Sequence, residues 1–342
     1  MRFGVQMNLQ APNLEAPESI IERAIEIAQV ADELGFHSVW LTEYHFSSYC
    51  YCPQPLMPLI KIATLTSRIR VGTSILVVPL HHPLQLAEDI AMADVLTNGR
   101  LEVGFGRGYQ PYEFARLGQH LDDSRSRYEE GLDIITEALT REPISHQGEH
   151  YQFPKTHIFP KLIQKPHPPY WIAAQSEDSV RMAIRRGMNI LTGGSRAAQA
   201  VAFWKLMEQI VAEEQLPSRP LFALQRYVYV GDSDAEARNK VDAVRWHVRV
   251  ATHLRQGTER VDTGGRAVAE PITNEIDDEI FFRDGGFLGA PDTVIGRVKD
   301  WHAQVPFDHL NCSLWAGDMT HQEVLASMQR FAREVMPELK AL

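Results

Sequence analysis

The stretch "RFGVQMNLQAP", residues 2–12, reads as a short buried strand followed by a turn that holds no glycine. An open, doubly wound α/β sheet usually carries a glycine-rich fingerprint directly after its first strand, because the backbone there must approach a dinucleotide closely. Without that fingerprint, a closed barrel is favoured over the open sheet, which remains the runner-up.

Strand-like and helix-like patterns alternate from this point to the end of the chain. Pro17 opens a segment whose apolar residues recur at the helical period, and Gly35 follows where helices usually end. Eight strands, nearly every one followed by a helix, predict parallel strands joined by right-handed crossovers. We therefore expect an α/β protein with one (β/α)8 TIM barrel over residues 1–342. The eight expected strands are RFGVQM, SVWLT, RVGTSIL, RLEVGFG, YWIAA, MNILT, LFALQRYVYV and HLNCSLW.

Two longer segments do not follow the alternation. Residues 141–168 are polar and rich in proline, and we expect a surface insertion there. Residues 252–288 carry no clean period, and a structureless stretch of that length in a compact domain is often a lid. Gly264 and Gly265 within it are candidate hinges. A dispensable surface loop is the alternative for this segment.

Composition and missing motifs exclude several classes of protein. The formal charge of -10 and the absence of any basic block argue against a nucleic-acid partner. No secretion signal is visible at the N-terminus, and no apolar run approaches the roughly 18 residues of a membrane helix, so we expect a cytoplasmic location without membrane contact. Cys50 and Cys52 lack a second ligand pair, so we expect no metal site. Walker, zinc-protease and hydrolase-elbow sequences are also absent.

In a (β/α)8 barrel the functional residues lie where the strands end. Arg107 lies between two glycines directly after a strand, and its guanidinium group suits a phosphate. Ser176 and Ser179 lie across a helix start, where free amides and the helix dipole attract anions. Either serine alone would be a simple N-cap, and Arg107 alone an ordinary ion-pair partner. Together these residues indicate a ligand that bears a phosphate.

Several stretches in this order resemble the bacterial luciferase-like family of flavin-dependent monooxygenases, especially the luciferase alpha subunit. The resemblance covers nearly the whole chain and is weakest in residues 252–288. It is specific for the superfamily and much less specific for the substrate. The stretches that carry it are "GFHSVWLTEYHF", "RVGTSILVVPLHHPLQLAED", "NGRLEVGFGRGY", "YQFPK" and "VMPELK".

The resemblance implies a barrel that binds reduced FMN, which a separate flavin reductase supplies. Oxygen then adds to the flavin to give a peroxyflavin, which oxygenates an organic substrate such as an aldehyde, a ketone or a terpene. Residues that match the family's phosphate contacts are Arg107, Arg125, Ser176 and Ser179, and Gln175 stands where the family commonly has glutamate.

Three further positions take their expected roles from the same resemblance. A cis peptide bond is expected between Ser74 and Ile75, packed flat against the flavin ring. Gly106 replaces the reactive cysteine of luciferase and is expected to leave more room beside the ring. Tyr44 replaces the catalytic histidine. An unperturbed tyrosine has a pKa near 10 and mainly donates a hydrogen bond, which argues against light emission from an aldehyde.

The resemblance also implies a mobile lid at residues 252–288 and a dimer, with a homodimer as our expectation. The family's interface matches the helix that contains Glu88 and Asp89, near His45, and a buried carboxylate–histidine pair there would be structural. For Glu43 the sequence leaves open whether it supports the site or satisfies the end of a strand.

Two other functions stay open at this point. One is a deazaflavin-dependent dehydrogenase, which uses the same fold for hydride transfer and would differ in the flavin that it binds. The other is a non-catalytic barrel, analogous to the luciferase beta subunit, that serves as a dimer partner. Retention of Arg107 and Arg125 argues against the second alternative.

Overall fold

The computed structural model describes residues 1–193, 197–257 and 261–342. Eight parallel strands form a closed ring in the order β1-β2-β3-β4-β7-β8-β9-β11, because β11 pairs with β1 and β8 pairs with β9. These are the eight strands predicted from the sequence, so the (β/α)8 prediction is confirmed. Their bounds are β1 Arg2–Met7, β2 Ser38–Leu41, β3 Arg70–Val77, β4 Leu101–Gly106, β7 Tyr170–Ala173, β8 Asn189–Gly193, β9 Phe222–Val230 and β11 His309–Ser313.

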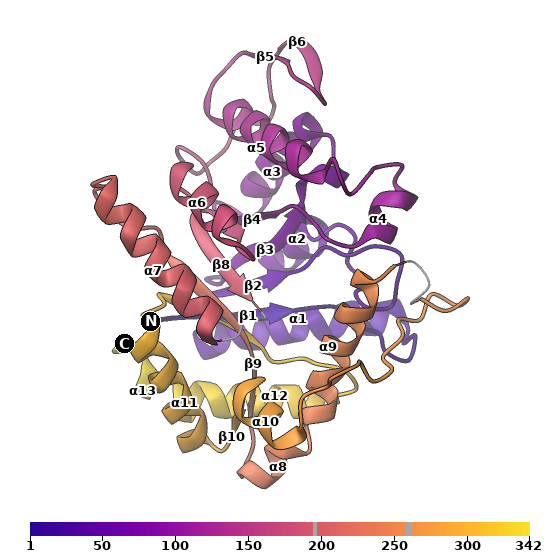
Figure 1. The fold of residues 1–342 in the computed structure, drawn as a ribbon, viewed down its shortest axis with the longest axis vertical. Helices are drawn as coiled ribbons and strands as arrows, with labels where there is room; N and C mark the ends of the chain where they lie inside the picture. The colour runs from indigo at the N-terminus through magenta and orange to yellow at the C-terminus, as the bar shows by residue number, and fades with distance from the viewer. Residues whose placement is uncertain (194–196, 258–260) are drawn as a thin grey trace.

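The helices surround the strands, with α5 and α6 on one side and α11 to α13 on the opposite side (Figure 1). Proline at the first turn starts several of them, and α6 and α12 begin with capping boxes. The bounds are α1 Pro17–Leu34, α2 Leu56–Leu65, α3 Pro83–Leu96, α4 Pro111–Arg116, α5 Ser124–Thr140, α6 Glu177–Arg185, α7 Ala197–Glu213, α8 Asp234–Arg238, α9 Val241–Arg255, α10 Asp278–Asp284, α11 Pro291–Gln304, α12 His321–Arg330 and α13 Met336–Leu339, with short turns η1 Val78–Leu80 and η3 Phe331–Val335. None of the described helices has the length and apolar character needed to cross a bilayer.

Two additions interrupt the regular order. The expected insertion contains an antiparallel hairpin, β5 Ile144–Gln147 and β6 Gln152–Thr156, which lies at the edge of the molecule beyond α5 (Figure 1). The segment 252–288 is less irregular than its sequence indicates, because α9 continues to Arg255, α10 lies within it, and a strand, β10 Gly286–Gly289, begins within it. Elements this short show too few turns to produce a period. Residues 258–260 of this segment lie outside the described part of the chain.

The inside of the barrel near the amino ends of its strands is polar and aromatic. The Glu102 carboxylate accepts hydrogen bonds from Arg70 Nε and Trp171 Nε1, both at 2.7 Å. Burial would raise its pKa, but His37, whose Nε2 lies 3.7 Å from the carboxylate, and the charge of Arg70 lower the pKa to about 2. His309 lies in the same cluster, and burial lowers its pKa from 6.5 to about 3.

Replacing His309 with glutamine should make the free energy of unfolding fall less steeply as the pH is lowered. The unfolded chain protonates this histidine near pH 6.5 and the folded protein only near pH 3, so His309 lowers stability as the pH falls between these values. We expect the free energy of unfolding of the wild type to fall more steeply than that of the variant, by about 1.4 kcal/mol per pH unit. Urea unfolding at several pH values measures both slopes. Equal slopes would show that His309 is protonated in the fold.

Candidate active site

The residues predicted from the sequence lie on consecutive strands of the ring. Tyr44 follows β2, Ser74 and Ile75 lie in β3, and Gly106 ends β4, with Arg107 directly after it. Gln175 and Ser176 follow β7, which is the next neighbour of β4. The barrel therefore brings these positions to one rim, at the carboxyl ends of the strands, where barrels of this type hold their sites.

The peptide bond between Ser74 and Ile75 is cis, as the sequence comparison with luciferase predicts. The pairing of β3 with β4 shifts register between Thr73 and Leu76, so the backbone around this bond leaves the regular ladder. Packing against a flavin ring stays a prediction.

The expectation of extra room at Gly106 is wrong. A Cβ atom at this position would lie 2.6 Å from Cδ1 and 2.7 Å from Cγ1 of Ile75. The Ile75 side chain therefore fills the space that a larger residue would take. Glycine is present because of this close approach, which involves two neighbouring strands and leaves no trace in the local sequence.

Arg107 and the start of α6 form the candidate phosphate site. Arg107 is exposed, and within the part of the chain that the structure describes it makes no hydrogen bond or ion pair. Ser176 is the N-cap of α6, with its Oγ accepting from the Ser179 amide at 3.3 Å, while Ser179 Oγ accepts from the Ser176 amide at 3.0 Å. The serines therefore form the structural cap, which orients the amides of the first turn toward the rim.

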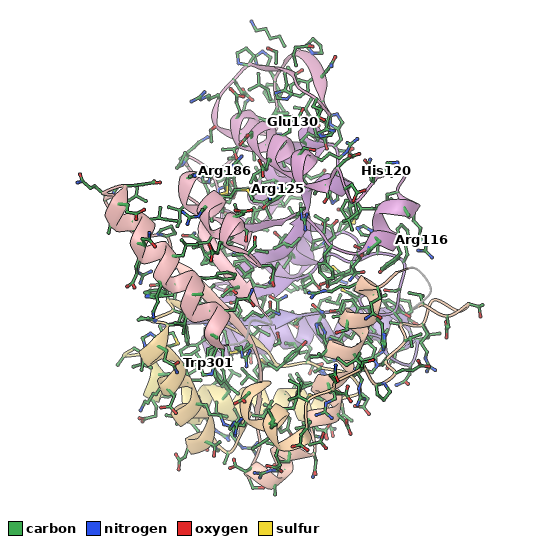
Figure 2. All side chains as sticks on the ribbon, viewed as in Figure 1. Arg116, His120, Arg125, Glu130, Arg186 and Trp301 are labelled. Carbon is green, nitrogen blue, oxygen red and sulfur yellow. The ribbon has the colours of Figure 1, made fainter. Side chains whose placement is uncertain are left out.

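Arg125, labelled in Figure 2, lies at the start of α5 and faces the first turn of α6. Its guanidinium group pairs with Asp178 at 3.1 Å and with Glu129 at 3.2 Å, and these hydrogen bonds raise its pKa. The structure thus brings Arg125 to the helix start that carries Ser176 and Ser179. Unlike Arg107, it must give up existing partners to bind an anion.

Gln175 connects β7 to the neighbouring strand. Its Nε2 donates to the carbonyl oxygen of Gly193, at the end of β8, over 3.1 Å. Its backbone amide donates to Ser179 Oγ at 3.0 Å. Gln175 therefore holds the rim together where the resemblance places a cofactor contact.

Tyr44 is part of a cluster of aromatic side chains at the rim. Its hydroxyl lies 3.1 Å from that of Tyr109, and its ring meets the Tyr49 ring edge to face at a centroid distance of 4.7 Å. Burial, together with the neighbouring Tyr109, raises the pKa of Tyr44 well above 10. The hydroxyl is therefore neutral and can donate a hydrogen bond.

Glu43, left open by the sequence, is fully buried and structural. It accepts hydrogen bonds from His81 Nε2 at 2.8 Å, from His45 Nε2 at 3.0 Å and from the Val77 amide at 3.0 Å. Burial alone would raise the pKa of Glu43, but the hydrogen bonds from the two histidines lower it. The carboxylate therefore links the end of β2 to the end of β3 through hydrogen bonds.

The buried carboxylate–histidine pair near His45 is thus formed within the chain. Glu88 and Asp89, the residues expected near it, are both exposed on α3. The pKa of Asp89 is raised by partial burial, which the nearby His81 opposes. Dimer formation stays a prediction.

Sequence reasoning missed three members of the rim: Tyr49, Tyr109 and His247. The Tyr49 hydroxyl lies 2.8 Å from His247 Nε2, and the Arg255 guanidinium lies 4.5 Å from the centre of the Tyr109 ring. Tyr109 could have been predicted, since it lies three positions after the end of β4 and two after Arg107. Tyr49 lies in a long loop and His247 in the middle of a helix, so neither has a local signal.

The carboxyl rim of this closed parallel barrel thus carries a capped helix start and an arginine that has no partner among the described residues, features that suit an anionic ligand. The chain belongs to the luciferase-like monooxygenase family, whose model matches residues 1–307. It is 29% identical over 349 residues to the oxygenase component of the flavin-dependent trigonelline monooxygenase of Acinetobacter baylyi, which covers 98% of this chain and 95% of the relative. Its relatives also include the alkanal monooxygenase alpha chain of the Kryptophanaron alfredi symbiont, which is 29% identical over 192 residues, covering 56% of this chain and 54% of the relative.

Solved structures share the whole fold. The monooxygenase RslO1 from Streptomyces bottropensis superposes with a TM-score of 0.84 at 25% identity, over 98% of this chain and 99% of that chain. The oxygenating constituent of 3,6-diketocamphane monooxygenase from Pseudomonas putida, solved with FMN, gives 0.79 at 20% identity over 98% of each chain. An F420-dependent secondary alcohol dehydrogenase superposes with a TM-score of 0.77 at 15% identity, over 99% of this chain and 98% of that chain. Proteins with this fold therefore use more than one kind of flavin.

Proposed function

We propose that this chain is the oxygenase component of a two-component monooxygenase that uses reduced FMN and O2 to oxygenate a small organic substrate. The observation that carries the proposal is Arg107, which has no partner among the described residues and follows β4. This strand pairs with β7, which leads to the capped start of α6, on the rim that also holds Tyr44. A free arginine fork and a helix start together suit a dianionic phosphate monoester such as that of FMN.

The residues present fit a flavin nucleotide in three respects. Arg107, with Arg125 close to the same helix start, would hold the phosphate, and the Ser176–Ser179 cap would aim the amides of α6 at it. The cis Ser74–Ile75 segment, with Gly106 packed against it, would support the ring. Gln175 would keep the β7 and β8 ends at a fixed spacing where the cofactor would bind.

Reduced FMN would supply two electrons, so that one oxygen atom of O2 enters the substrate and the other leaves as water. The trigonelline monooxygenase relative is named as an oxygenase component, so a separate flavin reductase is the partner that we infer. Tyr44, kept neutral by burial, would donate its hydrogen bond to the reacting oxygen or to the substrate. The residues around it would exclude water.

The segment after α9 supports the proposed lid. The Ser48 amide donates to the carbonyl oxygen of Gly265 at 2.9 Å, and the Ala267 amide donates to Ser48 Oγ at 3.0 Å. Ser48 lies in the same loop as Tyr44, so residues 261–267 lie against the loop that carries the proposed catalytic residue. We propose that this segment shields the reaction from water.

Replacing Tyr44 with phenylalanine should lower the coupling of flavin oxidation to product. The variant keeps the ring that packs against Tyr49 and loses only the hydroxyl, so we expect product per FMN oxidised to fall by roughly fivefold or more. Product mass and peroxide release under 18O2 measure the coupling, with one labelled oxygen expected in the product. Unchanged rate and coupling would remove Tyr44 from the mechanism.

The substrate and the flavin are tested in one assay. Enzymatically reduced FMN and O2 are supplied with a panel of aldehydes, ketones and terpenes, and trigonelline is added because a relative over the whole chain acts on it. If purified protein binds deazaflavin and not FMN, the dehydrogenase alternative is correct. If it binds neither flavin, the chain is a non-catalytic partner.

The same preparation shows by sedimentation whether the chain is a homodimer.

A further inference from the structure

His247 lies in the middle of α9, and its side chain meets residues that follow β1 and β2. Its Nδ1 lies 2.8 Å from Gln10 Nε2 and 3.3 Å from Asn8 Nδ2, both at the end of β1. Its Nε2 lies 2.8 Å from the Tyr49 hydroxyl. The ring of Tyr227, from β9, completes the surroundings at a centroid distance of 5.3 Å. No charged side chain of the described residues pairs with the imidazole.

The hydrogen bonds around His247 determine which ring nitrogen carries the proton. The backbone amide of Gly317 can only donate, and it donates to Gln10 Oε1 at 2.7 Å. The amide of Gln10 is therefore oriented with Nε2 toward His247, where it donates to Nδ1. Nδ1 must offer a lone pair, so the imidazole is neutral and carries its proton on Nε2.

This tautomer imposes a direction on the next hydrogen bond. Nε2–H of His247 donates to the Tyr49 oxygen, so the Tyr49 proton must point elsewhere. The ring of Tyr44 is in edge-to-face contact with the ring of Tyr49. The Tyr44 hydroxyl lies 3.1 Å from the Tyr109 hydroxyl. Burial first, and then Tyr44 and Tyr109, raise the pKa of Tyr49 well above 10, so Tyr49 stays protonated, as does Tyr44.

We propose that His247 is a positioning residue: fixed as the Nε2–H tautomer by Gln10 and Gly317, it directs the proton of Tyr49 away from its own ring and so orders the tyrosine cluster that contains Tyr44. The inference rests on the proposed function for its consequence in catalysis. The tautomer itself follows from the hydrogen bonds alone. Burial, which lowers the pKa of His247 to about 3, agrees with a neutral ring at all physiological pH values.

The first experiment measures the tautomer without flavin or substrate. Protein labelled with 15N in histidine is compared with the His247→Gln variant, and the signals lost in the variant belong to His247. We expect the neutral Nε2–H pattern with no titration between about pH 8 and pH 5. An Nδ1–H pattern, or a titration near pH 6.5, would overturn the proposal whatever the protein oxygenates.

A second variant changes the tautomer on purpose. In Gln10→Glu, the carboxylate would still accept from the Gly317 amide and would also accept from His247 Nδ1. We expect the nitrogen signals of His247 to change to a protonated Nδ1, with a pKa raised into the measurable range. Persistence of the wild-type pattern would show that Gln10 does not determine the tautomer.

The catalytic consequence is tested with two replacements of different chemistry. Glutamine at position 247 can accept from Gln10 and donate to Tyr49, whereas leucine fills space and does neither. We expect His247→Leu to lower product per FMN oxidised by roughly fivefold and His247→Gln to restore most of it, with the affinity for FMN unchanged in both. An equal loss in both variants, or no loss in His247→Leu, would show that His247 only packs.

His321→Gln, on the outer helix α12, is the matched control, because His321 pairs with Glu26 on α1 and lies outside the rim. Neither the His247 signals nor the coupling should change in it. If no substrate is oxygenated by the wild type, the proposed function fails, and the nitrogen spectra still decide whether His247 is held as inferred.

Discussion

Replacing Glu43 with alanine should destabilise the protein by about 3 to 5 kcal/mol, the usual cost of removing one partner from a buried, charged hydrogen-bond network. The change leaves His81 Nε2, His45 Nε2 and the Val77 amide without their common acceptor. His81 would also lose the carboxylate that keeps its pKa raised against the opposing effect of burial. Denaturant unfolding at pH 7 measures the loss.

The control for this change is Glu43→Gln. Glutamine keeps the size of the side chain and one acceptor oxygen, so the loss of stability should be clearly smaller than in the alanine variant. The affinity for FMN of the still-folded alanine variant should fall as well, because Glu43 fixes the end of β3 directly after the Ser74–Ile75 bond. A loss of stability below about 1 kcal/mol would show that water replaces the carboxylate.

Replacing Arg107 with alanine should weaken FMN binding by roughly 10-fold to 100-fold, because a charge-assisted hydrogen bond typically contributes about 1.5 to 3 kcal/mol. Arg107 has no partner among the described residues, so its full interaction is available to the ligand. Stability should change little, since the side chain is exposed. Titration of oxidised and reduced FMN, followed by fluorescence and absorbance, measures the dissociation constants.

Two matched variants complete this test. Arg125→Ala should weaken binding less, because Arg125 is already paired with Asp178 and Glu129 and must release them first. Arg107→Lys keeps the charge and loses the planar fork, so its affinity should lie between those of the wild type and the alanine variant. Equal affinity in wild type and Arg107→Ala would place the phosphate elsewhere and remove the observation on which the proposed function rests.

The ring of strands was predictable because each of its strands has a local pattern. Apolar runs such as SVWLT and HLNCSLW, separated by helical periods, identify the strands that β2 and β11 form. The rim residues follow from the same patterns, since whatever comes directly after a strand lies at the carboxyl end of the barrel. Arg107, Tyr44 and Ser176 were placed in this way.

Contacts between segments far apart in the chain were not predictable. The assignment of Glu43 to a structural role depends on His81, which lies 38 positions further on. His247 meets Gln10 across 237 positions, and Gly317 fixes Gln10 across 307. Hydrogen bonds of this kind depend on the distances and directions of side chains after folding, which no periodicity records.

The sequence by itself thus determined the barrel, the position of its functional rim and the resemblance to the luciferase-like family, because periodicity and local motifs encode neighbours along the chain. Only the tertiary structure decided that Ile75 fills the space beside Gly106, that Arg107 has no partner among the described residues while Arg125 has two, and that Tyr44 packs against Tyr49, which meets His247. Packing and hydrogen-bond direction arise when the barrel closes and brings distant strands and α9 to one rim.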